Sequence, residues 1–179
     1  MIFIDNADEE KVVGRLAEII ALEYGCCPTT ATQICNAAAL HDVGKQKIPD
    51  SILNKPGKLT TREFKIMKTH TYLGAEMLKG IQGELGIMAR ACSMYHHEWF
   101  NGGGYWGRRT NDLPFYVSFV AISDVFIALI SERAYKPGWP LKNAVAHIKK
   151  LAGTQFNPEL VKVFLSLVQN DSRVSVLIN

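Results

Sequence analysis

Helical periodicity is the feature that most limits what this chain can fold into. Apolar residues recur at every third or fourth position along most of its length, which is the spacing of one face of an α-helix. No stretch shows the strict alternation of apolar and polar residues that is typical of a half-buried strand. The pattern therefore predicts an all-α helical bundle of about 6–8 helices, the clearest over about residues 8–24, 30–42, 61–79, 85–97, 114–131, 140–151 and 158–168.

Two of these helices carry predictions about which side faces the core. Thr60 and Glu63 have the spacing of a capping box at the start of the 61–79 helix. The inward face of that helix is expected to hold Phe64, Met67, His70, Leu73 and Leu78. The inward face of the 85–97 helix is expected to hold Ile87, Met88, Ala91, Met94 and Tyr95. Residues 48–58 contain two prolines and a glycine and are expected to form a loop with at most one helical turn, and the tail from residue 169 has no defined pattern.

Length and composition indicate one globular domain. A chain of 179 residues is long enough for one substantial core and short for two. Apolar residues make up 47% and charged residues 21%, which excludes a disordered chain. We expect a single domain over residues 1–179, with its core in about residues 9–165. A formal net charge of +3 favours neither a DNA- or RNA-binding protein nor a membrane-surface protein, but it is compatible with a small anionic ligand.

The sequence also predicts a cytoplasmic protein with reduced thiols. The first five residues lack the basic start of a signal peptide. The most apolar stretch, 115–130, is broken by polar residues and falls short of the ~20 residues that span a bilayer. The four cysteines form no CxxC pair, so we expect reduced, mostly buried thiols at Cys26, Cys27, Cys35 and Cys92.

An adjacent histidine and aspartate end the second predicted helix. Neighbouring residues of a helix point about 100° apart, so His41 and Asp42 could both reach a metal cluster beside the helix end. Lys45 lies one turn further on and could face an anionic substrate. The alternative is a structural one: a buried helix that ends at Gly44, with an aspartate bonded to the backbone and a solvated lysine.

Other candidate ligands occur at helix ends and on apolar faces. His70 lies beside the apolar face of the 61–79 helix, where a satisfied core histidine is the common case, and His96 and His97 end the 85–97 helix. Asp124 is nearly the only charge in its apolar helix, and it is costly to bury unless it is paired, hydrogen-bonded or bound to a metal. Residues 101–107 contain three consecutive glycines and predict an irregular loop.

Together these residue types suit a metal-dependent reaction at a phosphate. Imidazole and carboxylate groups form the ligand set of Fe, Mn or Zn, and a shared carboxylate can bridge two ions. Two neighbouring ions generate hydroxide and neutralise charge on phosphoryl oxygens during phosphoester hydrolysis. Lys45, Arg133 and Lys136 would add fixed positive charge around those oxygens.

The order and spacing of these residues resemble the HD-GYP domain, the bacterial branch of HD phosphohydrolases that hydrolyses cyclic di-GMP. The resemblance covers about residues 9–165 and implies an HD-phosphohydrolase fold. It is carried by His41-Asp42, Gly44-Lys45, Ile48-Pro49, Lys55-Pro56-Gly57, His70, His96-His97-Glu98, Gly104-Tyr105, Asp124 and Arg133-x-Tyr135-Lys136.

The resemblance implies roles for individual residues. Two or three divalent ions, Fe or Mn, would be held by His41, Asp42, His70, His96, His97 and Asp124. Phosphate would be contacted by Lys45, Arg133 and Lys136, and the substrate-side loop would contain Gly104 and Tyr105. Asp42 and Lys45 would be catalytic: a metal-bridging hydroxide attacks phosphorus while Lys45 holds the phosphate. Cyclic di-GMP would be opened to pGpG, with GMP as a further product.

The chain departs from that pattern at three positions. Glu9 stands where the family usually has a histidine, and it could donate an oxygen to a metal with Asp5 in support, or simply favour the helix dipole at the surface. Trp106 replaces the proline of the GYP signature, and Trp99 replaces an arginine after Glu98.

These departures leave two alternatives to the phosphodiesterase. One is a degenerate domain that binds cyclic di-GMP or a protein without turnover, and the other is an HD hydrolase of another nucleotide or phosphoester. We expect control through a regulatory protein partner, a homodimer or metal supply, because no sensory domain precedes the helices.

Overall fold

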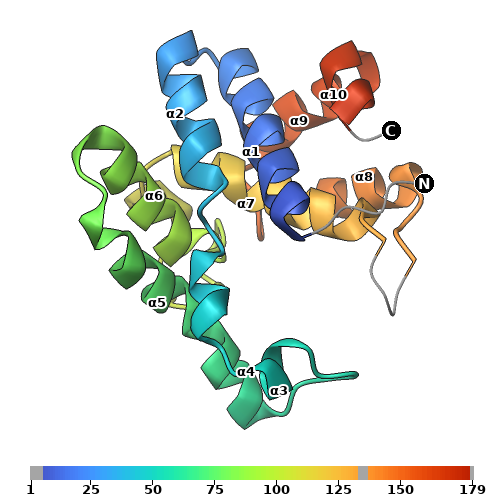
Figure 1. Ribbon diagram of the computed structural model, residues 1–179. Coiled ribbons are helices and arrows are strands. Elements are labelled where there is room, and N and C mark those ends of the chain that lie inside the picture. Colours follow the sequence, from blue (N-terminus) through green and yellow to red (C-terminus); the bar gives the residue numbers. More distant parts are fainter. Residues whose placement is uncertain (1–5, 133–136, 178–179) are drawn as a thin grey trace.

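The computed structural model describes residues 6–132 and 137–177, and Figure 1 shows that their regular structure is helical. In these residues an isolated bridge between Ala152 and Phe156 is the only β contact. The all-α prediction is confirmed. The α-helices are α1 (Asn6–Glu23), α2 (Pro28–Ala38), α3 (Asp50–Leu53), α4 (Thr61–Lys68), α5 (His70–Met77), α6 (Gly83–Tyr95), α7 (Tyr116–Ile130), α8 (Leu141–Lys150), α9 (Pro158–Asn170) and α10 (Ser172–Leu177). Three 3-10 segments, η1 (Val43–Lys47), η2 (Leu78–Gly80) and η3 (Thr110–Asp112), complete them.

Helices α1, α2 and α7 build the centre of the core. Helix α1 buries residues at helical spacing, among them Leu16, Ala17 and Ile20, and packs along α2 and across α7. The face of α2 toward the core consists of Ala31, Ile34, Ala37 and Ala38. Small residues let the two helix axes approach closely. This pairing fixes the end of α2, from which the His-Asp doublet follows.

The predicted 61–79 helix is two helices, because the chain breaks at Thr69. The Thr69 hydroxyl donates to the Ile66 carbonyl (2.6 Å), and the Thr71 hydroxyl donates to the Lys68 carbonyl (3.0 Å). The His70 Nδ1–H donates to the Met67 carbonyl (2.7 Å), which lies between those of Ile66 and Lys68. Side chains that occupy successive carbonyls compete with the helix ladder, which explains the break.

Two predicted inward residues are exposed instead. Phe64 is 42% exposed, because α4 extends away from the main body with α3 beside it (Figure 1). Ile87 is 60% exposed, because α6 turns its small residues Gly86, Ala89 and Ser93 inward. Ser93 packs directly on α5, where its hydroxyl donates to the Thr71 carbonyl (3.3 Å). Both predictions were therefore wrong.

Two other local predictions agree with the structure. The capping box of Thr60 and Glu63 is present, and the 48–58 segment contains the single short helix α3. The tail forms α10, which the sequence did not predict, and Val174 anchors it in the core. The cysteines are free thiols, as expected, but the prediction that most of them are buried was wrong. Of the four, Cys92 is buried, Cys26 and Cys35 are half-buried, and Cys27 is exposed at the turn before α2. Within the described ranges, no helix combines the length and apolarity needed to cross a membrane.

Candidate metal centre

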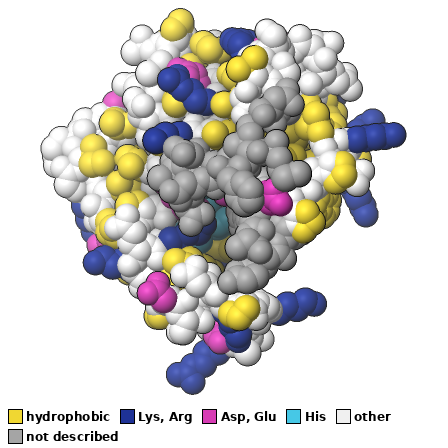
Figure 2. Space-filling model, turned by 45° about the vertical axis from the view of Figure 1, so that its right-hand side comes forward, with side chains coloured by type: hydrophobic (Ala, Val, Ile, Leu, Met, Phe, Trp, Pro, Cys, Tyr) yellow, Lys and Arg dark blue, Asp and Glu magenta, His cyan; other side chains and the backbone are white. Residues whose placement is uncertain are grey.

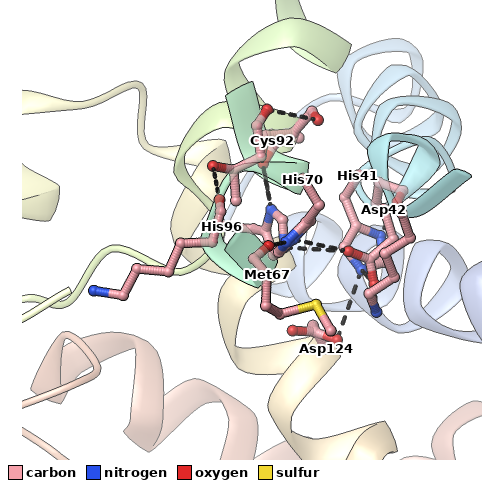
Figure 3. Close-up of polar contacts among 12 residues, drawn as sticks. His41, Asp42, Met67, His70, Cys92, His96 and Asp124 are labelled. Carbon is pink, nitrogen blue, oxygen red and sulfur yellow. Dashed lines mark hydrogen bonds and ion pairs between the residues drawn. The ribbon is translucent and has the colours of Figure 1, made fainter. Parts of the chain in front are cut away.

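The His-Asp doublet lies just beyond α2 rather than in its last turn. Helix α2 ends at Ala38, and residues 39–42 form turns that lead into η1. His41 is 1% exposed and Asp42 is 7% exposed. The turn directs both side chains into the space between α5, α6 and α7 (Figure 3).

Two glycines hold this turn against α5. A Cβ atom on Gly44 would lie 1.9 Å from the His70 carbonyl oxygen and 2.4 Å from the Gly74 nitrogen. A Cβ atom on Gly74 would lie 2.3 Å from Ser93 Oγ. Only hydrogen atoms fit at these positions, so η1 meets α5 backbone to backbone and the Ser93 hydroxyl of α6 rests on the Gly74 backbone. That contact brings the doublet within reach of His70.

Asp42 is the centre of the cluster. Its Oδ1 lies 3.2 Å from His70 Nε2 and 3.6 Å from His96 Nε2. Its Oδ2 lies 3.3 Å from His41 Nε2 and also contacts the Lys45 amine. The Nε2 atoms of His70 and His96 are 3.4 Å apart. From α7, Asp124 places its Oδ1 3.6 Å from His41 Nε2 (Figure 3).

Backbone carbonyls orient three of the imidazoles in the same way. Nδ1 of His41 lies 2.6 Å from the Ala38 carbonyl, and Nδ1 of His70 lies 2.7 Å from that of Met67. Nδ1 of His96 lies 2.9 Å from the Cys92 carbonyl. A carbonyl oxygen only accepts, so each Nδ1 carries the proton and Nε2 faces the cluster. Metal-binding histidines are oriented by this kind of bond to the other ring nitrogen.

Burial and mutual contacts set the protonation states of the carboxylates and imidazoles. Burial alone would raise the pKa of Asp42, but the imidazole of His41 and its neighbours hold it well below its usual range. The pKa of Asp124 is lowered against burial in the same way, chiefly by His41. Burial alone would lower the pKa of His41, yet the two carboxylates hold it well above normal. Burial, and then the neighbouring His96, lower the pKa of His97, so the His97 ring is neutral. The ionised carboxylates and the neutral His97 ring are in the states that bind metals, whereas His41 holds a proton that a bound cation would displace.

The donor set fits divalent cations. Buried atoms without a hydrogen-bond partner include His41 Nε2 and Asp42 Oδ1. A buried acceptor left unpaired costs about 1–3 kcal/mol, and a coordinated cation removes that cost. Two groups offer ligand atoms within 4.8 Å of one another: His70, His96 and His97, and His41, Asp42 and His96. These mixed imidazole and carboxylate groups suit first-row divalent metals.

Tyr105 lies at the edge of the centre, on the loop after α6. Its ring lies 4.4 Å from that of His97, which in turn lies 4.0 Å from that of His96. A Cβ atom on Gly104 would lie 2.5 Å from the His97 carbonyl oxygen, so the loop rests directly on the ligand segment. Figure 2 shows a histidine side chain in a hollow of the surface with a basic side chain beside it.

Helix α4 adds a cation and a ring that the sequence interpretation missed. The Lys68 amine lies 4.8 Å from the centre of the Tyr105 ring and 5.3 Å from that of Phe64. The Phe64 and Tyr105 rings meet edge to face at 5.8 Å. Lys68 precedes His70 by two residues, which was the available signal. The rim of the centre therefore combines positive charge with aromatic faces.

The remaining predicted residues have mixed outcomes. Glu9 is half-buried on α1 and belongs to neither metal-ligand group, while Asp5, Arg133 and Lys136 lie outside the described residues. The neighbouring Glu10, which the sequence interpretation passed over, interacts electrostatically with the centre: burial raises its pKa, and His41 opposes that rise. Both glutamates continue the buried stripe of α1 toward its start, so helical spacing alone does not separate them.

Comparison with known proteins agrees with this geometry. A family model described as an HD domain matches residues 5–160. A cyclic di-GMP phosphodiesterase of Thermotoga maritima is 41% identical over 156 residues, covering 87% of this chain and 42% of the relative. A 3'3'-cGAMP-specific phosphodiesterase of Vibrio cholerae is 40% identical over 154 residues, covering 86% of this chain and 30% of the relative. The chain thus spans less than half the length of these two relatives.

A solved structure supports the fold. A Bdellovibrio bacteriovorus protein described as an HDG"Y"P protein superposes with a TM-score of 0.72 at 20% identity, covering 93% of this chain and 55% of that protein. At this identity the likeness concerns the fold. With the family match and the curated relatives, these findings lead to one assignment. The chain belongs to the HD domain family, in its HD-GYP branch.

Proposed function

We propose that this chain is a metal-dependent phosphodiesterase that opens cyclic di-GMP to pGpG and carries the product on to GMP. The observation that carries the proposal is the convergence of His41, His70 and His96 on the Asp42 carboxylate, with buried ligand atoms that have no hydrogen-bond partner. Relatives named as cyclic di-GMP phosphodiesterases support the choice of substrate. The proposed catalytic unit is the single domain expected over residues 1–179.

The proposed cofactors are two or three divalent ions, Fe or Mn. The proposed ligands are His41, Asp42, His70, His96, His97 and Asp124, with Glu9 as a further oxygen donor. When bound, such ions lower the pKa of a water molecule and neutralise charge that builds on phosphoryl oxygens. Asp42 is suited to serve both ligand groups, because its Oδ1 faces His70 and His96 while its Oδ2 faces His41.

The protein's own residues would hold and orient the dinucleotide. Lys45, at 41% side-chain exposure, contacts the buried Asp42 and can turn its amine to a phosphate oxygen above the centre. Arg133 and Lys136 are proposed as further phosphate contacts. The Tyr105 ring, together with Gly104 and the α4 rim, offers a surface on which a guanine base can stack. Burial raises the pKa of Tyr105 to about 12, so its phenol stays neutral and can donate a hydrogen bond.

A second substrate is favoured by one specific observation. A relative that is 40% identical is named as specific for 3'3'-cGAMP, which differs from cyclic di-GMP in one base. The phosphates and the metal chemistry would be the same for both dinucleotides. Contacts to the bases at the rim, rather than the ligand set, would then decide the preference.

The test is product analysis with the two dinucleotides in parallel. The protein is purified without oxygen, loaded with ferrous iron or manganese, and incubated with cyclic di-GMP or 3'3'-cGAMP. We expect pGpG, followed by GMP, from cyclic di-GMP and no product from His41→Ala at equal protein concentration. Metal-loaded wild type that binds the dinucleotide but forms no product would refute the enzyme and favour a receptor. Turnover of 3'3'-cGAMP alone would refute the proposed substrate.

A further inference from the structure

The loop that carries Tyr105 is tied down by a buried carboxylate. Glu98 follows the two histidines at the end of α6 and is only 2% exposed. Its Oε1 accepts the backbone N–H of Trp106, and its Oε2 accepts that of Arg108, both at 2.6 Å. Hydrogen bonds to an ionised group are roughly twice as strong as neutral ones. One carboxylate therefore closes the chain from 98 to 108 into a ring.

The Trp106 side chain makes a second connection, to α5. Its indole Nε1–H donates to Thr71 Oγ1 at 3.1 Å. Thr71 is fully buried and follows His70 directly, and its hydroxyl donates in turn to the Lys68 carbonyl at 3.0 Å. The hydroxyl thus both donates and accepts, and it links the loop to the backbone beside a proposed metal ligand.

The two hydrogen bonds that Trp106 donates, one from its backbone and one from its indole, need groups that a proline lacks. The HD-GYP signature has a proline where this chain has Trp106, and proline has neither a backbone N–H nor an indole. Tyr105, the preceding residue, is held between the Glu98 bond and the His97 ring. The substitution therefore replaces a stiff ring with two directed hydrogen bonds.

We propose that Trp106 is a positioning residue that fixes Tyr105 over the metal centre through Glu98 and Thr71. The departure from the family signature is then a different way of holding the substrate-side loop, and the loop does not lose its function. The effect on substrate binding rests on the proposed function. The effect on the loop does not, so the two are tested separately.

The loop is tested by nuclear magnetic resonance of the full chain without substrate. Three tryptophans give three indole N–H signals, and Trp106→Phe identifies the one of interest. Thr71→Val should shift that signal and speed its hydrogen exchange about twofold to tenfold, the range expected for one hydrogen bond. Thr71→Ser, which keeps the hydroxyl, should restore protection, and the indole of Trp139 should not change. An unchanged Trp106 indole in Thr71→Val would overturn the proposal.

Trp106→Phe gives an independent measurement should Thr71→Val fail to fold. It keeps the backbone N–H and an aromatic ring at a position that is 41% exposed. We expect faster exchange of the residue-106 amide, which donates to Glu98, with protection of the Arg108 amide retained. Equal protection of the residue-106 amide in Trp106→Phe and wild type would contradict the proposed role of the indole.

Kinetics test the consequence for the substrate. Trp106→Phe and Thr71→Val should each raise KM about twofold to tenfold with kcat and metal content unchanged. The double variant should be no worse than Thr71→Val alone, because that change already removes the bond that Trp106→Phe removes. Trp139→Phe serves as the matched control. Additive effects in the double variant would refute the shared bond. Absence of turnover in wild type would refute the proposed function. The indole exchange measurement would then still test whether Trp106 positions the loop.

Discussion

Asp42→Asn should remove metal binding while keeping the shape of the side chain. The carboxylate lies 3.2–3.6 Å from the Nε2 atoms of three histidines, so it serves both ligand groups. Loss of a residue that only supports a ligand costs about 10–100-fold in metal affinity. Loss of the shared ligand itself should therefore cost at least about 100-fold. We expect the variant to lose the ions proposed at both ligand groups.

The size of the effect follows from mass action. A metal concentration of about 100 Kd stabilises the folded wild type by about 2.7 kcal/mol. For a chain of this size that corresponds to an increase in Tm of about 5–10 °C. At the same concentration, a 100-fold weaker variant gains about 0.4 kcal/mol, or about 1–2 °C.

The assay is thermal unfolding with and without Mn²⁺, together with elemental analysis of dialysed protein. Asp50→Asn is the matched control, because Asp50 is exposed at the start of α3 and belongs to neither group of candidate metal ligands. It should keep the wild-type increase in Tm and metal content. If Asp42→Asn retained the full metal stoichiometry and the full increase in Tm, the shared-carboxylate assignment would be wrong.

Three further outcomes follow from the structure. Gly44→Ala should destabilise the fold by about 1–3 kcal/mol in chemical unfolding, since its Cβ would overlap backbone 1.9 Å away, whereas Gly80→Ala, with open space around it, should change little. Lys68→Gln should raise KM for the dinucleotide about threefold to tenfold at unchanged metal content; an unchanged KM would exclude the α4 rim from the substrate site. The Lys55 amine lowers the pKa of Glu63 from its usual 4.5 to about 2. The stability that the ionised Glu63 gives to α4 is therefore present above about pH 4.5 and lost as pH falls toward 2. Glu63→Gln should abolish that pH dependence, measured by amide exchange of α4.

Periodicity predicted the fold class well because it depends only on which residues share a helix face. It did not predict which face finds a partner, and α4 shows why: Phe64 lies on a helix that extends away from the core. The break at Thr69 was missed because side-chain bonds to the Ile66, Met67 and Lys68 carbonyls compete with a favourable helical pattern. Such local competition leaves no mark on hydrophobic spacing.

The residue types of the centre could be predicted because charged groups are rare in apolar helices. Asp124 stood out for that reason and lies in the cluster, whereas His70, also in the cluster, was assigned as a ligand through the resemblance to the HD-GYP pattern. Lys68 could have been found from its position two residues before His70, whereas the proximity of Glu10 depends on how α1 meets the site, which helical spacing does not determine. The same holds for the ring that Glu98 closes, since its partners are backbone groups that carry no sequence signal.

The most direct test of the centre is anomalous X-ray scattering from crystals of the full chain loaded with Mn²⁺. We predict strong peaks at bonding distance from Asp42, one beside His41 and another beside His70 and His96, with the carboxylate between them. Peaks of that kind would establish the shared ligand that the proposed chemistry requires. A metal-loaded crystal with no peak at Asp42, or with its peaks only at other residues, would contradict the account.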